Sequence, residues 1–584
     1  MTNDSLPADL NPRLSNLIAK QLHNAPDSIA LFDGERSVSV KQFDQLCRAG
    51  ADWLLDQGIV AGDRVALWLV NRVEWLALLF GAARIGATIV SVNTRYRATE
   101  LEYLLAKSGA RLLILQHDFR GIDFPAVLAA ADPSTLPALE KVALLDEGAM
   151  PTQLLGRPCI RLVLPTPLSP IQDASNEASE RHAGTQARLD HPAATGSHAS
   201  QETDDDSDPQ AITLLYTTSG TTKGPKLVMH TQRSLAWHAQ QVAQSYGLTQ
   251  GDCALLGALP LCGTFGMTGV LASLAAGAPA ILMDAFDGQR AAALVNKHQV
   301  THMFGSDEMY RRMMEAIPTR NPFPSARMFG YAAFAPRGEE FAIDSNARGL
   351  PLVGLYGSSE VQALFSVQPA HLPVAERVRG GGQPAATQAL VRIRDLETGK
   401  LAATGVSGEI EISSPGNFAG YMNDPQATAA VVAADGFFST GDIGHLREDG
   451  SFIYETRRGD AIRLGGFLVN PAEIEDVIKS FPGVTDVGVI GIEIDGQPRC
   501  VAFVVLNDSR ELEQVQAARA MTQAARDVMA NFKVPARIWF IDALPVTASA
   551  NGTKVQRAKM REMALANLAR EHDALPASSG NQHV

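Results

Sequence analysis

Short apolar runs alternate with longer amphipathic segments through the first part of the chain. The strand-like runs RVALWLV, TIVSV and RLLIL are separated by the helix-like segments EWLALLFGAARIG and ATELEYLLAKSG. Short apolar runs between turn residues are typical of buried strands, and their alternation with helices is typical of a parallel sheet. The pattern therefore predicts an α/β unit over about 28–165.

The alternation is interrupted once and then resumes. Residues 166–210 contain few side chains that could be buried, which predicts a disordered insertion. The strand-like runs AITLLYTT, DCALLGALPL, APAILM, VTHMF and LPLVGLYG follow. The apolar stretch at 269–283 is short and broken by Gly and Pro, so we expect buried core there and not a membrane span.

The pattern changes again in the last third of the chain. From about 376, Gly-rich turns and alternating strands such as ALVRIRD and GEIEIS predict an antiparallel β subdomain. Further on, NPAEIEDVIKS begins a helix with Asn470 at the N-cap and Pro471 at the first helical position. The strands DVGVIGI, RCVAFVVL and RIWFI and a helix over about 511–531 complete a smaller α+β unit.

The expected fold class is therefore α/β. A large N-terminal domain of parallel α/β sheets with an antiparallel β subdomain precedes a small α+β C-terminal domain. The expected boundaries are 1–457 for the large domain, 458–460 for a hinge, 461–570 for the small domain and 571–584 for a disordered tail.

Composition narrows the class of protein. The net charge of −13 argues against a nucleic-acid binder, whose footprint would be basic. The polar, acidic N-terminus does not resemble a signal peptide, and scattered thiols fit a reducing compartment, so we expect a cytoplasmic protein. The cysteines form no metal-binding spacing: Cys47, Cys159, Cys253, Cys262 and Cys500.

Candidate chemistry begins at 217–226, TTSGTTKGPK, directly after the run AITLLY. Glycines, hydroxyls and a lysine after a strand suit a phosphate cradle. The P-loop pattern G-x-x-x-x-G-K-[ST] does not match, because three residues separate Gly220 from Gly224 and Leu227 follows Lys226. Taken alone, the loop is either another kind of phosphate grip or a polar turn.

Four more motifs follow in order: YGSSE at 356–360, STGD at 439–442, RRGDAIRLGGFLVNPAEIE at 457–475 and NGTK at 551–554. With the first loop, this set resembles the adenylate-forming superfamily, which comprises acyl- and aryl-CoA synthetases, peptide-synthetase adenylation domains and firefly-type luciferases. The resemblance implies an AMP-forming ligase that activates a carboxylic acid with ATP, releases pyrophosphate and transfers the acyl group to coenzyme A. Because two anions must approach each other, oriented N–H groups, positive charge and Mg²⁺ are expected.

The resemblance also implies roles for individual residues. Tyr356 would stack on adenine, Glu360 would hold Mg²⁺ and Asp442 would bind both ribose hydroxyls. Arg457 would contact ribose and phosphate, and Lys554 would bridge the substrate carboxylate and the α-phosphate. The expected catalytic residues are Lys554, Thr218, Glu360 and Arg457. The expected ATP and AMP contacts are Thr218, Ser219, Gly220, Thr221, Thr222, Lys226, Tyr356, Gly357, Ser358, Ser359, Asp442, Arg457 and Lys554.

The motifs depart from their commonest forms in places. Lys223 stands where glycine is usual in the phosphate loop. Its side chain either contacts a phosphate or points to solvent, and the sequence leaves both possibilities open. Family members perform two reactions by rotating the small domain. The resemblance places Gly459 at that hinge and Gly465 and Gly466 along a channel for the pantetheine arm of coenzyme A.

The substrate acid is less well defined by the sequence. The expected pocket residues are Gly263, Thr264, Phe265, Ser306, Tyr331, Ala332, Ala333 and Gly354. Amino-acid-adenylating members of the family carry an aspartate in the segment that matches PLCGTFG at 260–266, to pair with the α-ammonium group, so its absence here disfavours an amino acid. Small residues at 263, 332, 333 and 335 indicate room for a ring or a chain of moderate length, which favours a medium-chain fatty or aromatic acid. The expected partners are that acid, ATP and coenzyme A, with no nucleic acid, in a monomer or homodimer. A carrier-protein phosphopantetheine acting in trans and a non-catalytic homologue remain alternatives.

Overall fold

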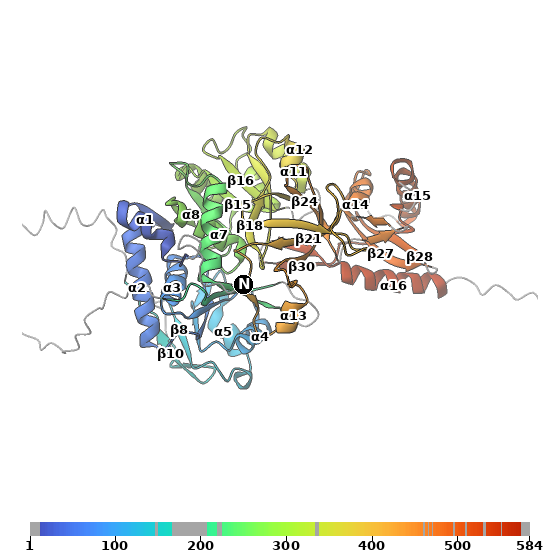
Figure 1. The fold of residues 1–584 in the computed structure, drawn as a ribbon. Coiled ribbons are helices and arrows are strands. Elements are labelled where there is room, and N and C mark those ends of the chain that lie inside the picture. The colour runs from blue at the N-terminus through green and yellow to red at the C-terminus, as the bar shows by residue number, and fades with distance from the viewer. Residues whose placement is uncertain are drawn as a thin grey trace, which may run out of the picture.

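The computed structural model describes most of the 584 residues. The described ranges are 12–145, 150–165, 207–218, 225–332, 338–458, 462–464, 467–469, 471–494, 497–507, 511–529, 533–549 and 552–573. Figure 1 shows two lobes, a larger one formed by the first part of the chain and a smaller one that contains α14, α15 and α16.

The first sheet of the large lobe has nine strands in the order β22-β12-β11-β4-β3-β5-β8-β10-β9. In chain order they are β3 (Arg64–Trp68), β4 (Thr88–Ser91), β5 (Leu112–Leu115), β8 (Lys141–Leu144), β9 (Gln153–Leu154), β10 (Arg157–Arg161), β11 (Ile212–Thr217), β12 (Leu227–Thr231) and β22 (Gly420–Tyr421). The central strands run parallel, and β4 and β5 are buried at every position. Burial on both faces explains why these strands are continuous apolar runs in the sequence.

The second sheet has thirteen strands in the order β2-β1-β14-β13-β15-β16-β17-β18-β19-β24-β23-β21-β20. They are β1 (Ile29–Asp33), β2 (Arg36–Ser39), β13 (Leu255–Gly257), β14 (Ala280–Leu282), β15 (His302–Ser306), β16 (Met328–Ala332), β17 (Leu352–Ser358), β18 (Gln362–Val367), β19 (Gly381–Pro384), β20 (Leu390–Arg394), β21 (Gly408–Ser413), β23 (Phe438–Leu446) and β24 (Phe452–Arg457). Neighbouring strands are parallel in the part of the sheet that runs β1-β14-β13-β15-β16-β17. They are antiparallel in the part that runs β17-β18-β19-β24-β23-β21-β20. The expected antiparallel region is therefore continuous with the parallel sheet.

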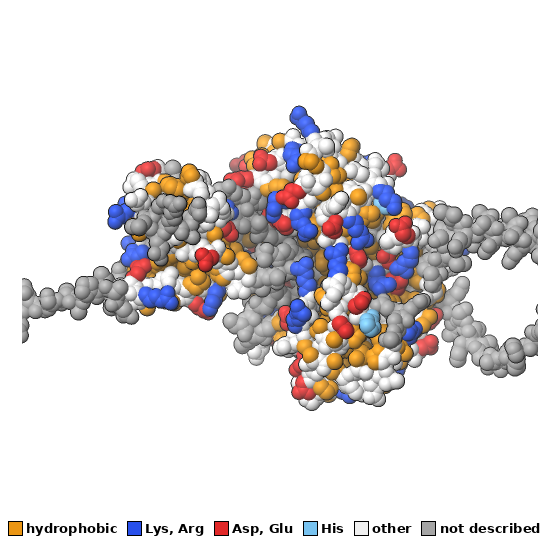
Figure 2. Space-filling model, turned by 180° about the vertical axis from the view of Figure 1, so that it is seen from behind, with side chains coloured by type: hydrophobic (Ala, Val, Ile, Leu, Met, Phe, Trp, Pro, Cys, Tyr) orange, Lys and Arg blue, Asp and Glu red, His pale blue; other side chains and the backbone are white. Residues whose placement is uncertain are grey.

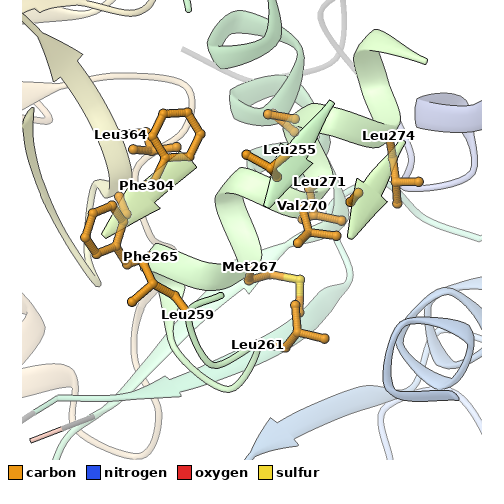
Figure 3. Packing of buried hydrophobic residues seen from close by; sticks show 14 of the residues in the cluster. Leu255, Leu259, Leu261, Phe265, Met267, Val270, Leu271, Leu274, Phe304 and Leu364 are labelled. Atoms are coloured by element: carbon orange, nitrogen blue, oxygen red, sulfur yellow. The ribbon is translucent and has the colours of Figure 1, made fainter. Parts of the chain in front are cut away.

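Helices pack on and between these sheets. They are α1 (Asn16–Asn24), α2 (Val40–Asp56), α3 (Val73–Arg84), α4 (Ala98–Ser108), α5 (Phe124–Ala129), α7 (Gln232–Ser245), α8 (Thr264–Ala276), α9 (Gly288–Lys297), α10 (Asp307–Ala316), α11 (Gly338–Ala347), α12 (Val374–Arg377) and α13 (Pro425–Ala429). Helix α8 is apolar on all sides, and Figure 3 shows its Phe265, Val270 and Leu271 among Leu255, Phe304 and other side chains of one core cluster. The apolar stretch at 269–283 is thus core, as expected. None of the helices in the described part of the chain is long and apolar enough to span a membrane.

The C-terminal lobe has its own core. Its elements are β25 (Ile462–Leu464), β26 (Phe467–Val469), α14 (Pro471–Lys479), β27 (Val484–Ile494), β28 (Gln497–Leu506), α15 (Glu511–Val528), β29 (Arg537–Phe540), β30 (Val546–Ser549), β31 (Gly552–Val555) and α16 (Arg557–Asp573). Strands β27, β28 and β29 form a sheet covered by the helices, as the alternating pattern predicts.

Two expected boundaries differ from the structure. Most of the 166–210 segment lies outside the described residues, but its end at 207–210 is described and makes tertiary contacts. Ser207 accepts a hydrogen bond from Gln232 Nε2 at 2.8 Å and, through its carbonyl, one from Arg13 Nε at 2.6 Å. At the other end, α16 continues to Asp573, beyond the expected domain end at 570, because the Glu571 carboxylate accepts hydrogen bonds from β29.

The surface carries both signs of charge. Figure 2 shows Lys and Arg side chains interspersed with Asp and Glu over the face that it displays. All five cysteines are buried as free thiols. Burial raises the pKa of Cys262, next to the expected pocket, to about 11, so this thiol is protonated at neutral pH.

Candidate active site

The phosphate-loop sequence is held at the end of a hairpin between β11 and β12. These strands pair antiparallel, with Thr217 opposite Leu227. Beyond that pair, the Thr218 N–H donates to the Lys226 carbonyl at 3.1 Å, and the Lys226 N–H donates to Thr218 Oγ1 at 3.2 Å. A third hydrogen bond comes from Tyr96, whose hydroxyl donates to Thr217 Oγ1 at 3.0 Å. The two ends of the loop are therefore fixed to each other, while 219–224 lie outside the described residues.

Lys226 and Glu360 are connected through one aromatic side chain. The Lys226 ammonium lies 4.4 Å from the centroid of the Tyr421 ring, in a cation–π contact. The Tyr421 hydroxyl donates to Glu360 Oε1 at 2.9 Å. Tyr421 belongs to β22, whose pairing with β12 places it opposite Val228. The structure thus brings a residue of the first motif and a residue of the second together on one side chain.

The backbone around Glu360 is also fixed. His230 Nε2 lies 2.7 Å from the Ser359 carbonyl, and the Phe418 N–H donates to the Glu360 carbonyl at 2.7 Å. Burial lowers the pKa of His230 to about 4, so the imidazole is neutral at pH 7. Because a carbonyl can only accept, the proton is on Nε2, and Nδ1 lies 3.2 Å from the Ser234 hydroxyl oxygen.

A second group of predicted residues meets where β17, the middle of β23 and the end of β24 come together. Tyr356 donates its hydroxyl proton to Asp442 Oδ2 at 2.6 Å, and Arg457 Nε lies 2.8 Å from Asp442 Oδ1. Asp442 is only 3% exposed. Burial, and then the neighbouring Asp442 charge, raise the pKa of Tyr356 well above its usual value, so the phenol remains a donor. The Tyr356 ring packs edge-on against Phe452, with centroids 5.2 Å apart.

Glu360 can be tested as a magnesium ligand from its surroundings. Among the described residues there is no group of three His, Cys, Asp or Glu side chains that could hold a metal alone. Mg²⁺ is usually bound by one or two carboxylates together with substrate phosphates. Glu360 is half-buried, and the hydrogen bond from Tyr421 occupies its Oε1. This arrangement fits a Mg²⁺ ion that is shared with the phosphates of a nucleotide.

Several pocket positions lie at the carboxyl ends of three adjacent parallel strands. Ser306 ends β15 and pairs with Ala332 at the end of β16, while Tyr331 pairs with Gly354 of β17. Ligands of open α/β sheets bind outside such strand ends. Other contacts limit what these residues offer a ligand. Ser306 Oγ accepts from the Met309 N–H at the start of α10.

Gly354 and Tyr331, two of the expected pocket residues, also make contacts that the packing of the chain requires. A Cβ on Gly354 would lie 1.9 Å from the Arg379 carbonyl oxygen, so its lack of a side chain serves chain packing. The Tyr331 hydroxyl donates to the Val378 carbonyl, and Tyr331 is 1% exposed. At Gly263, by contrast, a Cβ would meet one atom within 4 Å, the Pro260 carbonyl oxygen at 3.6 Å. A side chain at Gly263 would therefore meet open space, whereas one at Gly354 would not.

The remaining pocket residues near Gly263 belong to the start of α8. Thr264 Oγ1 accepts from the Ala363 N–H at 3.2 Å, and Phe265 is 8% exposed within the core cluster. Gly357 and Ser358, both expected nucleotide contacts, end β17, and Ser358 Oγ accepts from the Glu360 N–H at 3.3 Å.

Some predicted site residues cannot be placed. Lys554 lies in β31, where its backbone pairs with Thr547, but its side chain is not described. The others fall outside the described residues: Ser219, Gly220, Thr221, Thr222, Lys223, Ala333, Gly459, Gly465 and Gly466.

Sequence reasoning missed Tyr421 and His230. His230 lies only four positions after Lys226, yet its contact is with Ser359. Tyr421 reaches Glu360 from β22, which no motif marks. The segment GYMNDP around it carries turn signals, so the sequence indicates a loop there and not a contact to the site.

The geometry agrees with comparisons to known proteins. The model of the AMP-binding enzyme family matches residues 18–422, and that of the AMP-binding enzyme C-terminal domain matches 473–551. The chain therefore belongs to the AMP-binding enzyme family. Within the adenylate-forming superfamily it is an acyl/aryl-CoA synthetase, an AMP-forming acid–CoA ligase, as the sequence motifs predict.

Its relatives include ligases for ring-bearing acids. The chain is 30% identical over 548 residues to 2-succinylbenzoate–CoA ligase of Geobacillus kaustophilus, covering 92% of this chain and 96% of that one. It is 27% identical to 3-hydroxybenzoate–CoA ligase of Aromatoleum sp., covering 92% and 94%. The fold is similar to that of ATP-bound MatB from Rhodopseudomonas palustris, with a TM-score of 0.73, 24% identity and coverage of 94% and 99%. An anthranilate CoA ligase in complex with anthranoyl-AMP gives a TM-score of 0.74 at 22% identity, with coverage of 97% and 100%.

Proposed function

We propose that this enzyme activates a carboxylic acid with an uncharged, ring-bearing tail and transfers it to coenzyme A. The observation that carries the proposal is the pair of side-chain clusters, Lys226–Tyr421–Glu360 and Tyr356–Asp442–Arg457. The pocket positions expected from the sequence include no charged residue, which favours an uncharged tail. The named substrates of its relatives, 2-succinylbenzoate and 3-hydroxybenzoate, contain an aromatic ring, and of the two only 3-hydroxybenzoate has no second carboxylate. A medium-chain fatty acid is the other acid that such a pocket suits.

In the first step, a carboxylate oxygen of the acid attacks the α-phosphorus of ATP, and the bond to the bridging oxygen breaks to release pyrophosphate. The loop that ends at Thr218 and Lys226 would hold the departing phosphates, and Lys554 would pair with the attacking carboxylate. Asp442 would accept hydrogen bonds from the ribose, with Arg457 and Tyr356 fixing its two oxygens. Mg²⁺ held by Glu360 would neutralise phosphate charge.

In the second step, the sulfur of coenzyme A attacks the acyl carbon, and the bond to the AMP oxygen breaks. We propose that the small domain turns about Gly459, so that Gly465 and Gly466 face the site and leave room for the pantetheine arm. The boundaries proposed for the two domains remain 1–457 and 461–570, apart from the helical residues up to Asp573. The five free, buried thiols support the proposal that the enzyme works in the cytoplasm.

The test is acid-dependent exchange of labelled pyrophosphate into ATP, run on a panel of acids. The panel contains benzoate, 3-hydroxybenzoate, 2-succinylbenzoate, octanoate and alanine, followed by a thioester assay with coenzyme A. We expect exchange with benzoate or 3-hydroxybenzoate, little with 2-succinylbenzoate, whose second carboxylate stays charged, none with alanine, and a CoA thioester of the accepted acid. Exchange without thioester formation would point to a carrier-protein acceptor. No exchange with any acid would overturn the proposal.

A further inference from the structure

Tyr421 makes two different contacts with groups that the proposed mechanism uses. The face of its ring carries the Lys226 ammonium at 4.4 Å, and its hydroxyl donates to Glu360 Oε1 at 2.9 Å. The side chain is only 5% exposed. Lys226 lies beside β12 of the nine-stranded sheet, and Glu360 lies between β17 and β18 of the thirteen-stranded sheet. Tyr421 therefore connects the β11–β12 hairpin with the loop that carries Glu360.

The position of Tyr421 is fixed from several sides. The Phe418 ring packs against it at 60°, with centroids 5.0 Å apart. Its strand pairs with β12, and its own N–H donates to Thr428 Oγ1 at 2.9 Å. The Phe418 N–H in turn holds the Glu360 carbonyl at 2.7 Å. These contacts hold the ring beside Lys226 and the hydroxyl beside Glu360.

The hydroxyl of Tyr421 is the donor in its bond to Glu360, because a carboxylate oxygen accepts. The bond therefore fixes the direction of Oε1. The opposite carboxylate oxygen is then directed by the same bond.

We infer that Tyr421 is a positioning residue that sets the Glu360 carboxylate for Mg²⁺ through its hydroxyl and seats the Lys226 ammonium for the nucleotide phosphates through its ring. This inference rests on the proposed function, because Glu360 and Lys226 have these partners only in an ATP-dependent enzyme. The two contributions belong to different atoms of one side chain. They can therefore be separated by substitution.

Two variants make the separation. Tyr421→Phe keeps the ring under Lys226 and removes the donor to Glu360, while Tyr421→Leu removes both. The probe is the fluorescent analogue mant-ATP, whose Kd is measured at a series of free Mg²⁺ concentrations and in EDTA, with no acid present. Tyr246→Phe is the matched control, since it also removes a buried hydroxyl, one that donates to the carbonyls of Leu364 and Ser366. Thermal unfolding of each protein shows which variants are folded.

The outcomes differ for each part of the inference. In Tyr421→Phe, the Mg²⁺ concentration at which the Kd for mant-ATP has fallen halfway should rise about tenfold, since loss of a residue that orients a metal ligand has effects of that order. The Kd for mant-ATP in EDTA should stay close to that of the wild type. In Tyr421→Leu, the same shift should be joined by weaker binding in EDTA, about threefold, because the ammonium loses its ring. An unchanged Mg²⁺ titration in Tyr421→Phe would overturn the role of the hydroxyl. Equal binding of the Phe and Leu variants in EDTA would overturn the role of the ring.

Glu360→Gln separates this inference from the proposed function. If Glu360 binds Mg²⁺, this variant shifts the Mg²⁺ titration at least as far as Tyr421→Phe does. If Glu360→Gln has no effect, the proposed metal ligand is wrong, and the inference fails with it. If Glu360→Gln shifts the titration but Tyr421→Phe behaves like Tyr246→Phe, only the inference about Tyr421 is wrong.

Discussion

Removal of one oxygen atom from Tyr356 tests how the ribose would be held. In the structure the Tyr356 hydroxyl donates to Asp442 Oδ2 at 2.6 Å, while Arg457 holds the other oxygen at 2.8 Å. The substitution Tyr356→Phe keeps the ring that would contact adenine and its packing against Phe452. It therefore changes the ribose side of the site and leaves the adenine side intact.

The magnitude follows from the burial of Asp442, which is 3% exposed. A hydrogen bond to a charged group contributes about 1.5–3 kcal/mol, and the variant should lose that amount of stability in the large lobe. The loss occurs in the free enzyme as well as in the complex. Only the part that comes from a reoriented carboxylate reduces nucleotide affinity, and we expect this part to raise the Kd for ATP about fivefold, or ~1 kcal/mol.

The assay compares ATP with 2′-deoxy-ATP and 3′-deoxy-ATP in the wild type and in Tyr356→Phe. If Tyr356 holds Asp442 for the ribose, each deoxy nucleotide should lose less affinity in the variant than in the wild type, with a coupling of ~1 kcal/mol. The reasoning would be refuted by equal losses in both proteins, or by tighter ATP binding in the variant. Tyr246→Phe again serves as the control, with expected losses equal to those of the wild type.

Four further outcomes are expected. Lys554→Ala should abolish acid-dependent pyrophosphate exchange and spare thioester formation from a supplied acyl-adenylate, and equal loss of both half-reactions would contradict the assigned role. Gly466→Leu should block thioester formation while exchange continues, so loss of exchange would argue against a channel there. Gly354→Ala should give little folded protein in expression and thermal-melt tests, because its Cβ would lie 1.9 Å from the Arg379 carbonyl oxygen. His238 is buried, which lowers its pKa to about 4 in the folded state, so the unfolded state takes up a proton between about pH 6.5 and 4. The free energy of unfolding should therefore fall as pH falls through that window, with a contribution from this residue of at most about 1.4 kcal/mol per pH unit. The thermal midpoint should fall with it, and His238→Gln should make the midpoint depend less steeply on pH.

Local patterns predicted the elements that depend on short-range order. The strands β3, β4 and β5 and the helices α3 and α4 lie where the apolar runs and amphipathic segments indicate them. Each element is continuous in sequence. Burial on both faces makes β4 and β5 apolar runs, and α4 buries one face of an amphipathic segment. The helix α14 begins at Pro471, as the N-cap pattern predicts.

Sheet continuity could not be predicted in the same way. The strands ALVRIRD and GEIEIS were identified as antiparallel, and they are, but they extend the parallel sheet through β18 and β19. That connection depends on glycines that let strands approach closely. A Cβ on Gly382 would lie 2.1 Å from the Val367 carbonyl oxygen, and Gly382 has φ of +109°. The sequence GGG indicates a turn equally well, so only the structure distinguishes the two.

Some residues of the site could be predicted from the sequence and others could not. Tyr356, Asp442 and Arg457 could be named from their motifs, because each motif keeps its residues close together in the sequence. Tyr421 could not, because its contact with Glu360 depends on the pairing of β22 with β12, between segments that are far apart in the chain. Motifs identify the groups that would touch the nucleotide. The residues that orient those groups are fixed by tertiary packing, and a variant such as Tyr421→Phe is therefore the more direct test of whether this packing, and not the motif alone, sets the chemistry.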